Sequence, residues 1–125
     1  MMRFPLKHLA TAICLCALTI TPSQAAESVV VTVKVFPSPG REDELQASYI
    51  RRLEFLRKNE PGATFRLLRS KKEPTTFLWY EVYESAKAYE NHVKVVMPAF
   101  RKESGATPEG IIAKPSESES YIELN

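Results

Sequence analysis

Cysteine and histidine are scarce in this sequence, which limits the kinds of site it can build. The 125 residues include two cysteines and two histidines. Cys14, Cys16 and His8 lie near the N-terminus, so only His92 remains in the rest of the chain. One histidine without cysteines does not make a transition-metal site, a disulfide or a thiolate nucleophile. We therefore expect neither a metal nor any other cofactor.

The N-terminal 25 residues have the pattern of a secretory signal peptide. Arg3 and Lys7 are followed by an uncharged apolar run over 9–20, and then by the small residues Ser23 and Ala25. A membrane anchor is the alternative, but the run is shorter than the roughly 20 residues that a transmembrane helix needs. We expect cleavage after Ala25, with residues 26–125 forming one domain in the periplasm or outside the cell.

No charge of one sign dominates the remaining domain. The sequence has 17 basic and 15 acidic residues, and removal of Arg3 and Lys7 with the signal peptide leaves 15 of each. Such a balance gives no general attraction to nucleic acid or to anionic lipid. The sequence also lacks the glycine-rich loops of nucleotide-binding proteins and the serine elbow of hydrolases. We expect no nucleic-acid partner and no stable membrane association after cleavage.

Hydrophobic periodicity predicts four strands and two main helices in the order βαββαβ. The predicted strands are 29–36, 64–70, 77–83 and 121–124, and the helices are 41–58 and a segment after Ser85 that kinks or restarts at Pro98. We also expect Ser85 to cap the second helix, 107–112 to form a short helical turn and 115–120 to be a solvated connection. This order is typical of the α+β ferredoxin-like fold, an antiparallel sheet with helices on one face.

The third predicted strand is apolar on both faces. In a single chain with one layer of helices, only one of these faces is covered. Phe77, Trp79 and Tyr83 alternate along one face with Glu81 among them, and a second apolar row alternates with them. That second row consists of Leu78, Tyr80 and Val82. We expect the face left open to pack against a second copy, giving a homodimer whose two sheets form a shared barrel. The sequence leaves open which face this is, and a monomer with scattered exposed aromatics is the alternative.

The segment 59–93 resembles the central signature of the antibiotic biosynthesis monooxygenase domain. The matching positions are Glu60, Pro61, Gly62, Phe65, Pro74, Phe77, Glu81, Tyr83, Glu84, Ser85, Ala88, Tyr89 and His92. The resemblance implies a dimeric α+β barrel. Some members of this family oxygenate phenolic or quinol-like compounds without metal or flavin, whereas others degrade haem, isomerise a small metabolite or have no assigned activity. The resemblance implies that haem-degrading members use an asparagine on the first strand and a histidine in the second helical segment. Here the first strand has no asparagine and 100–103 has no histidine, so haem degradation is disfavoured.

Oxygenation without a cofactor requires a base, because a phenol must lose its proton before it can reduce O₂. His92 is the candidate base, and Glu81 is a candidate for orienting a protonated partner or for serving as an alternative base. The aromatic residues expected to bind the substrate are Phe65, Trp79, Tyr83, Tyr89 and Phe100. Packing roles are the alternatives: a core histidine, a carboxylate paired with a basic residue, and aromatic side chains of the core.

These observations predict a cofactor-independent monooxygenase acting on a small aromatic or quinol-like compound. Two other interpretations stay open: a non-catalytic dimeric module that binds a hydrophobic ligand or has a stress-related role, and an isomerase of a small metabolite. The arginines of the first helix, Arg51 and Arg52, are interpreted as parts of a solvated face with weak ion pairs.

Overall fold

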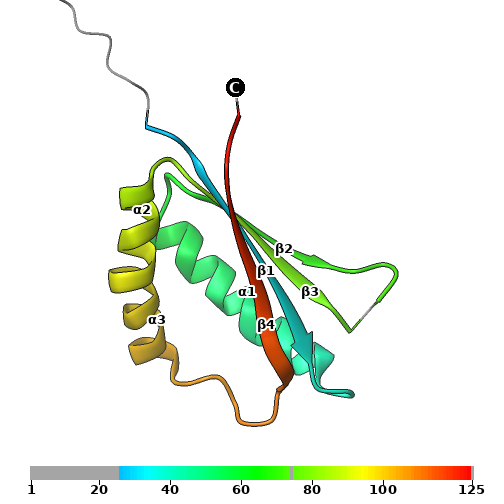
Figure 1. Ribbon diagram of the computed structural model, residues 1–125. Coiled ribbons are helices and arrows are strands. Elements are labelled where there is room, and N and C mark those ends of the chain that lie inside the picture. The colour runs from blue at the N-terminus through cyan, green and yellow to red at the C-terminus, as the bar shows by residue number, and fades with distance from the viewer. Residues whose placement is uncertain (1–25, 74, 125) are drawn as a thin grey trace, which may run out of the picture.

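The computed structural model describes residues 26–73 and 75–124. The predicted signal peptide, residues 1–25, lies outside this part of the chain, as does Pro74. The elements follow the predicted order. They are β1 (Val29–Pro37), α1 (Glu42–Asn59), β2 (Thr64–Arg69), β3 (Phe77–Tyr83), α2 (Ala86–Asn91), the π-helical turn η1 (His92–Val96), α3 (Met97–Ser104) and β4 (Ile112–Ile122). Figure 1 shows their arrangement.

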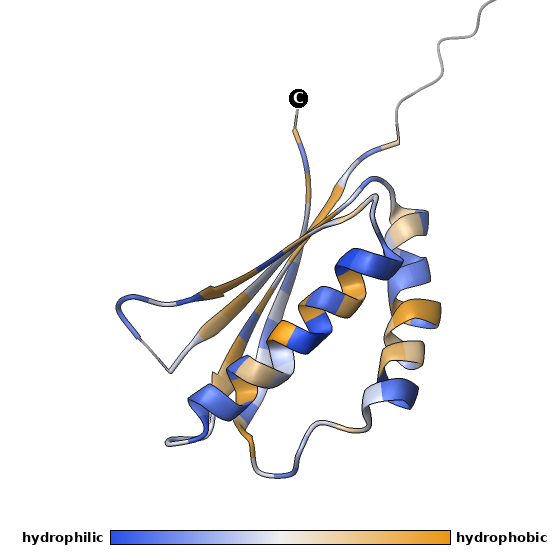
Figure 2. Cartoon of the chain, turned by 180° about the vertical axis from the view of Figure 1, so that it is seen from behind, coloured by the Kyte–Doolittle hydropathy of each residue, from blue (hydrophilic) through white to orange (hydrophobic). Residues whose placement is uncertain are grey.

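The strands form one antiparallel sheet in the order β2-β3-β1-β4, which confirms the predicted ferredoxin-like fold. The two strands in the middle, β1 and β3, are the most apolar. β-branched and aromatic residues favour strands, and the first strand alone contains five valines in nine residues. The helices α1, α2 and α3 lie on one face of this sheet (Figures 1 and 2).

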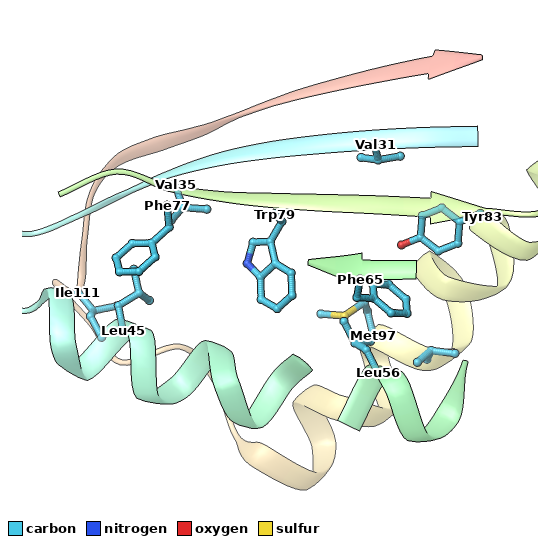
Figure 3. Close-up of a cluster of buried hydrophobic side chains, with 11 residues drawn as sticks. Val31, Val35, Leu45, Leu56, Phe65, Phe77, Trp79, Tyr83, Met97 and Ile111 are labelled. Carbon is cyan, nitrogen blue, oxygen red and sulfur yellow. The ribbon is translucent and has the colours of Figure 1, made fainter. Parts of the chain in front are cut away.

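The helices cover the face of β3 that carries the larger aromatic residues. Burial alternates strictly along β3, with Phe77, Trp79, Glu81 and Tyr83 buried and the residues between them half-buried. Figure 3 shows Phe77 and Trp79 pointing from β3 toward α1. Residues on the two faces of a strand point in opposite directions, so this arrangement decides which apolar row is left uncovered.

The uncovered face is the one that carries Leu78, Tyr80 and Val82. No helix of the described chain lies over it, and its neighbours on the outer strands include Leu68 and Tyr121, which are 47% and 48% exposed. Tyr80 pairs with Thr32 on one side and with Arg66 on the other. This face is therefore a continuous surface of mixed apolar and polar side chains across the sheet.

Helix α1 has the amphipathic pattern that its sequence predicts. Leu45 and Leu56 are completely buried, and Tyr49 and Leu53 are half-buried between them. Three acidic residues occupy the first turn and two basic residues the last, as the helix dipole favours. In Figure 2, where α1 lies in front of the sheet, hydrophobic segments recur between hydrophilic ones along the helix.

The second helical segment is continuous but passes through a π-helical turn. Ser85 caps it as predicted, because its hydroxyl accepts a hydrogen bond from the Ala88 amide. Pro98 is the second residue of α3 and lies just after the π-helical turn, so the hydrogen bond that proline cannot donate is missing where the α-helical pattern is already interrupted. Within the π-helical turn, His92 and Val96 are buried, whereas Val93 is 48% exposed.

Two predictions for the C-terminal region are wrong. Residues 107–112 form no helix: 107–111 turn, with the Ile111 amide bonded to the Pro108 carbonyl and Gly110 at a φ of 70°, and Ile112 begins β4. Residues 115–120 belong to β4 and are not a connection, since the strand runs from Ile112 to Ile122. Backbone pairing with β1 does not depend on apolar side chains, and the alternating serine and glutamate residues suit an exposed edge strand.

Candidate functional site

A cavity of about 380 Å³ lies between the sheet and the helices. Every layer of the fold contributes to its wall. Residues from the successive elements include Val31 of β1, Arg52 of α1, Glu81 of β3, His92 of η1, Phe100 of α3 and Ser118 of β4. Concave sites of this size, with a mainly apolar wall and a few converging polar groups, are typical of small-molecule sites.

His92 borders the cavity and is held from behind by Glu60. Its Nδ1 atom lies 2.7 Å from Glu60 Oε2, and the two side chains are only 5% and 9% exposed. Glu60 directly follows α1, in the turn that continues with Pro61 and Gly62. A carboxylate only accepts hydrogen bonds, so Nδ1 carries the hydrogen, and no described residue forms a hydrogen bond with Nε2.

The backbone around His92 is unusual as well. The residue opens the π-helical turn η1, a conformation that occurs mostly as single turns and frequently at functional sites. The ring packs against Phe65, with centroids 5.8 Å apart, and against Tyr83, with centroids 5.2 Å apart. These contacts and the bond to Glu60 fix the orientation of the imidazole before any ligand is present.

Glu81 is the second ionisable group on the cavity wall, and it is 3% exposed. The strand register places it between Val31 and Phe65, so its nearest neighbours in the sheet are apolar. Its Oε2 accepts a hydrogen bond of 2.7 Å from the Tyr83 hydroxyl. Burial, together with the nearby charge of Glu81, raises the pKa of Tyr83 far above its usual value, so the phenol remains a donor to Glu81.

Arg52 is the cation nearest to Glu81 among the described residues, but the pair is loose. Arg52 Nη2 lies 4.0 Å from Glu81 Oε1, which is longer than a charge-assisted hydrogen bond. The guanidinium lies over the Trp79 ring, with Cζ 4.8 Å from the ring centroid, and 6.0 Å from that of Tyr49. Burial lowers the pKa of Arg52, and the charge of Glu81 partly offsets this effect.

Arg52 forms no hydrogen bond with any residue that the structure describes, and its Nε–H is sealed from solvent without an acceptor. Leaving a buried donor unpaired costs about 1–3 kcal/mol. The expectation that Arg52 belongs to a solvated face is therefore wrong. Its spacing contained the signal: Arg52 follows Tyr49 by three residues and precedes Leu56 by four, which places it at the edge of the apolar stripe.

Residues 28–102 match the family model described as antibiotic biosynthesis monooxygenase. The chain belongs to this family. The match covers the elements β1 to α2 and most of α3, and thus includes Glu60, Glu81 and His92. It confirms the resemblance inferred from segment 59–93. Comparison with curated proteins finds no match.

Solved structures with the same fold are distant from this chain in sequence. A protein from Caulobacter crescentus CB15, provisionally described as an antibiotic biosynthesis monooxygenase, is 20% identical over 81% of this chain and 93% of its own, with a TM-score of 0.67. A protein from Nitrosomonas europaea with the same provisional description is 23% identical over 79% and 92%, with a TM-score of 0.63. Rv0793 from Mycobacterium tuberculosis is 18% identical over 78% and 96%, with a TM-score of 0.62. At these identities the likeness establishes the fold.

The residues predicted for the site fall into two groups in this antibiotic biosynthesis monooxygenase domain. His92, Glu81, Tyr89 and Phe100 line the same cavity. The other three belong to the hydrophobic core beside it: Phe65, Trp79 and Tyr83. Their contacts support the lining residues, because Phe65 and Tyr83 pack on the His92 ring and Trp79 lies under Arg52.

In the described part of the chain, no group of three or more histidine, cysteine, aspartate or glutamate side chains is arranged to hold a metal ion. None of the described helices has the length and apolar character needed to cross a membrane.

The Tyr83–Glu81 hydrogen bond gives a stability prediction. Tyr83→Phe keeps the ring but leaves a buried carboxylate without its donor, so we expect the free energy of unfolding to fall by about 1.5–3 kcal/mol. Tyr89→Phe is the matched control, because the Tyr89 hydroxyl has no hydrogen bond to a described residue and its ring also packs against Tyr83. Urea unfolding followed by circular dichroism measures both variants. Equal losses in the two would contradict the role given to the Tyr83 hydroxyl.

Proposed function

We propose that this protein is a cofactor-independent monooxygenase that oxidises a small aromatic or quinol-like compound in the cavity. The observation that carries the proposal is the His92–Glu60 pair, held at 2.7 Å and bordering a cavity with an aromatic wall. A base of this kind and a dry environment are what direct reaction of a phenol with O₂ requires.

In the proposed reaction the neutral Nε2 of His92 removes a phenolic proton from the substrate. Glu60 stabilises the imidazolium that forms, since it accepts the Nδ1–H throughout. The phenolate passes one electron to O₂, and the resulting radicals combine at a ring carbon to give a peroxide. Loss of water then leaves the oxidised ring. For a hydroquinone, the four electrons come from the substrate, one oxygen atom enters the ring to give a hydroxyquinone, and the other leaves as water.

The cavity wall supports this chemistry in two ways. Tyr89 and Phe100 provide aromatic surface against which a planar ring can pack. Glu81 is engaged by Tyr83 and faced by Arg52, so it is better placed to orient Arg52 than to act as a second base. This assigns the acid–base step to His92 alone.

The same geometry is compatible with two other functions. A non-catalytic ligand-binding module would use the cavity without turnover, and an isomerase would use the His92–Glu60 pair to move a proton without O₂. The discriminating measurement is dissolved oxygen during incubation with a panel of quinols and anthrones. Binding without oxygen uptake favours the module, whereas conversion of a compound at constant oxygen favours the isomerase.

The base is tested by His92→Ala. We expect its kcat/KM for oxygen uptake with 1,4-hydroquinone to fall about 10²- to 10⁴-fold, the usual contribution of a positioned base. An oxygen electrode measures the rate above the enzyme-free background, and circular dichroism checks the fold. Val95→Ala, on the same π-helical turn but 58% exposed, is the control and should retain the wild-type rate. Full activity in His92→Ala would show that His92 is not the base.

We also propose that a second copy of the chain covers the open face of the sheet. Leu78, Tyr80 and Val82 provide an apolar row there, and hydrophobic burial between two such faces favours a sheet-on-sheet homodimer. The helices occupy the other face, so each chain can keep its own cavity in the dimer.

Light scattering tests the dimer. We expect the wild type to have twice the mass of one chain at micromolar concentration, and Leu78→Glu to have the mass of one chain, because a charge in a desolvated apolar interface is costly. The control is Ile50→Glu, which places the same charge on the exposed side of α1 and should remain dimeric. A single-chain mass for the wild type would overturn this part of the proposal.

A further inference from the structure

We propose that the ligand of the cavity is an acidic aromatic compound, a planar ring bearing a carboxylate, and that Arg52 binds the carboxylate. This inference rests on the proposed function only in taking the cavity as the ligand site. It assigns to Arg52 a role in specificity, separate from the proton transfer assigned to His92.

The first support is the unmet hydrogen-bonding capacity of Arg52. No hydrogen bond joins Arg52 to a residue that the structure describes: its Nε–H is sealed without an acceptor, and Nη2 stays 4.0 Å from Glu81. Most buried polar groups in proteins find a partner. The Nη groups, which are not sealed from solvent, are the donors that an acceptor entering the cavity can reach. The side chain is 22% exposed, and Arg52 is part of the cavity wall.

The second support is the fixed position of the guanidinium. It lies on the face of Trp79, a side chain that is itself 1% exposed and rigidly packed in the core. Glu81 attracts Arg52 from 4.0 Å without taking up its N–H groups. A planar donor group held in this way matches the two oxygens of a carboxylate, and little conformational freedom remains to be lost on binding.

The third support is the balance of charge around the cavity. Two arginines, Arg52 and Arg101, belong to its wall, whereas Glu81 is the carboxylate on that wall and already accepts the Tyr83 hydroxyl. Glu60 is engaged by His92. The wall itself therefore carries two guanidinium groups and one carboxylate, which favours an anion over a neutral compound of the same shape. Aromatic side chains on the same wall, Tyr89 and Phe100, suit the ring that bears the charge.

The experiment compares two probes that differ only in charge, 2-naphthoate and the neutral 2-naphthalenemethanol. Each is titrated into the mature chain at neutral pH, and binding is followed by the NMR signal of the indole N–H. The sequence has a single tryptophan, so that signal reports on Trp79, directly beside Arg52. We expect the wild type to bind 2-naphthoate at least about tenfold more tightly than the alcohol.

Three variants locate the source of this preference. Arg52→Gln removes the charge and should abolish the preference, whereas Arg52→Lys keeps the charge but loses the planar fork and should retain only part of it. Arg51→Gln is the matched control, because Arg51 is the exposed neighbour on the same helix and should leave both affinities unchanged. The comparison of the two probes on the wild type stands by itself if a variant does not fold.

Equal affinity for the two probes, no binding of either at millimolar concentration, or a preference that survives in Arg52→Gln would each overturn the proposal. The measurement involves no turnover, so it is separable from the oxygenase test. Arg52-dependent binding of 2-naphthoate without oxygen uptake on any quinol would leave this inference standing and refute the monooxygenase. Oxygen uptake on neutral quinols without a preference for the anion would do the reverse.

Discussion

The site depends on one carboxylate that is built into the apolar face of a central strand. Glu81 occupies the position in β3 where alternation calls for another hydrophobic residue, with Val31 and Phe65 beside it in the sheet. An isolated charge there would be strongly destabilising. Two groups stabilise the carboxylate of Glu81. The Tyr83 hydroxyl, two residues along the strand, donates a hydrogen bond to it, and the Arg52 guanidinium of α1 lies 4.0 Å away. Through these contacts Glu81 positions Arg52, and Tyr83 in turn packs on the ring of His92.

The second feature on which the site depends is the cavity between the sheet, α1 and the segment α2–η1–α3. Phe77 and Trp79 point from β3 toward α1 and belong with Leu45 to the hydrophobic core (Figure 3). Toward Glu81 and His92 the same layers enclose the cavity instead. The π-helical turn begins at His92, and both His92 and Val93 belong to the wall of the cavity. The irregular backbone thus coincides with the candidate site, as π-helical turns frequently do.

Much of this could be predicted from the sequence, and the failures have physical causes. Strong periodicity predicts β1, α1 and β3, and the hydroxyl of Ser85 predicts the start of α2. A last strand is predicted only over 121–124, whereas β4 runs from Ile112 to Ile122. An edge strand is stabilised by backbone pairing, which leaves little trace in side chains such as those of Ser118 and Glu119. Helical spacing predicts Val93 on the side of Tyr89 and His92, and it does line the cavity with them, but spacing alone does not show that it is 48% exposed.

The candidate site was predicted only in part. His92 and Glu81 were identified because ionisable residues among apolar ones indicate an unusual environment. Their partners were not, since Glu60 is distant in sequence from His92 and only the fold brings them together. Arg52 was overlooked because arginines on a helix are usually solvated, and composition does not reveal that Trp79 and Glu81 lie beneath it. The neighbours of a charged side chain therefore follow from the fold and cannot be inferred from the sequence pattern alone.

The strict alternation along β3 also separates the two surfaces of the domain. Glu81 and its aromatic neighbours point toward the helices, whereas Leu78, Tyr80 and Val82 point away from them. The cavity is lined by residues of the helices and of the helix-facing side of the sheet, so one chain supplies the whole set of groups proposed to act on a ligand. Cover on the open face would then stabilise the sheet that holds Glu81 without contributing a side chain to the chemistry. A substitution on either surface can thus be interpreted separately, because the pleat of the strand keeps packing between copies apart from ligand recognition.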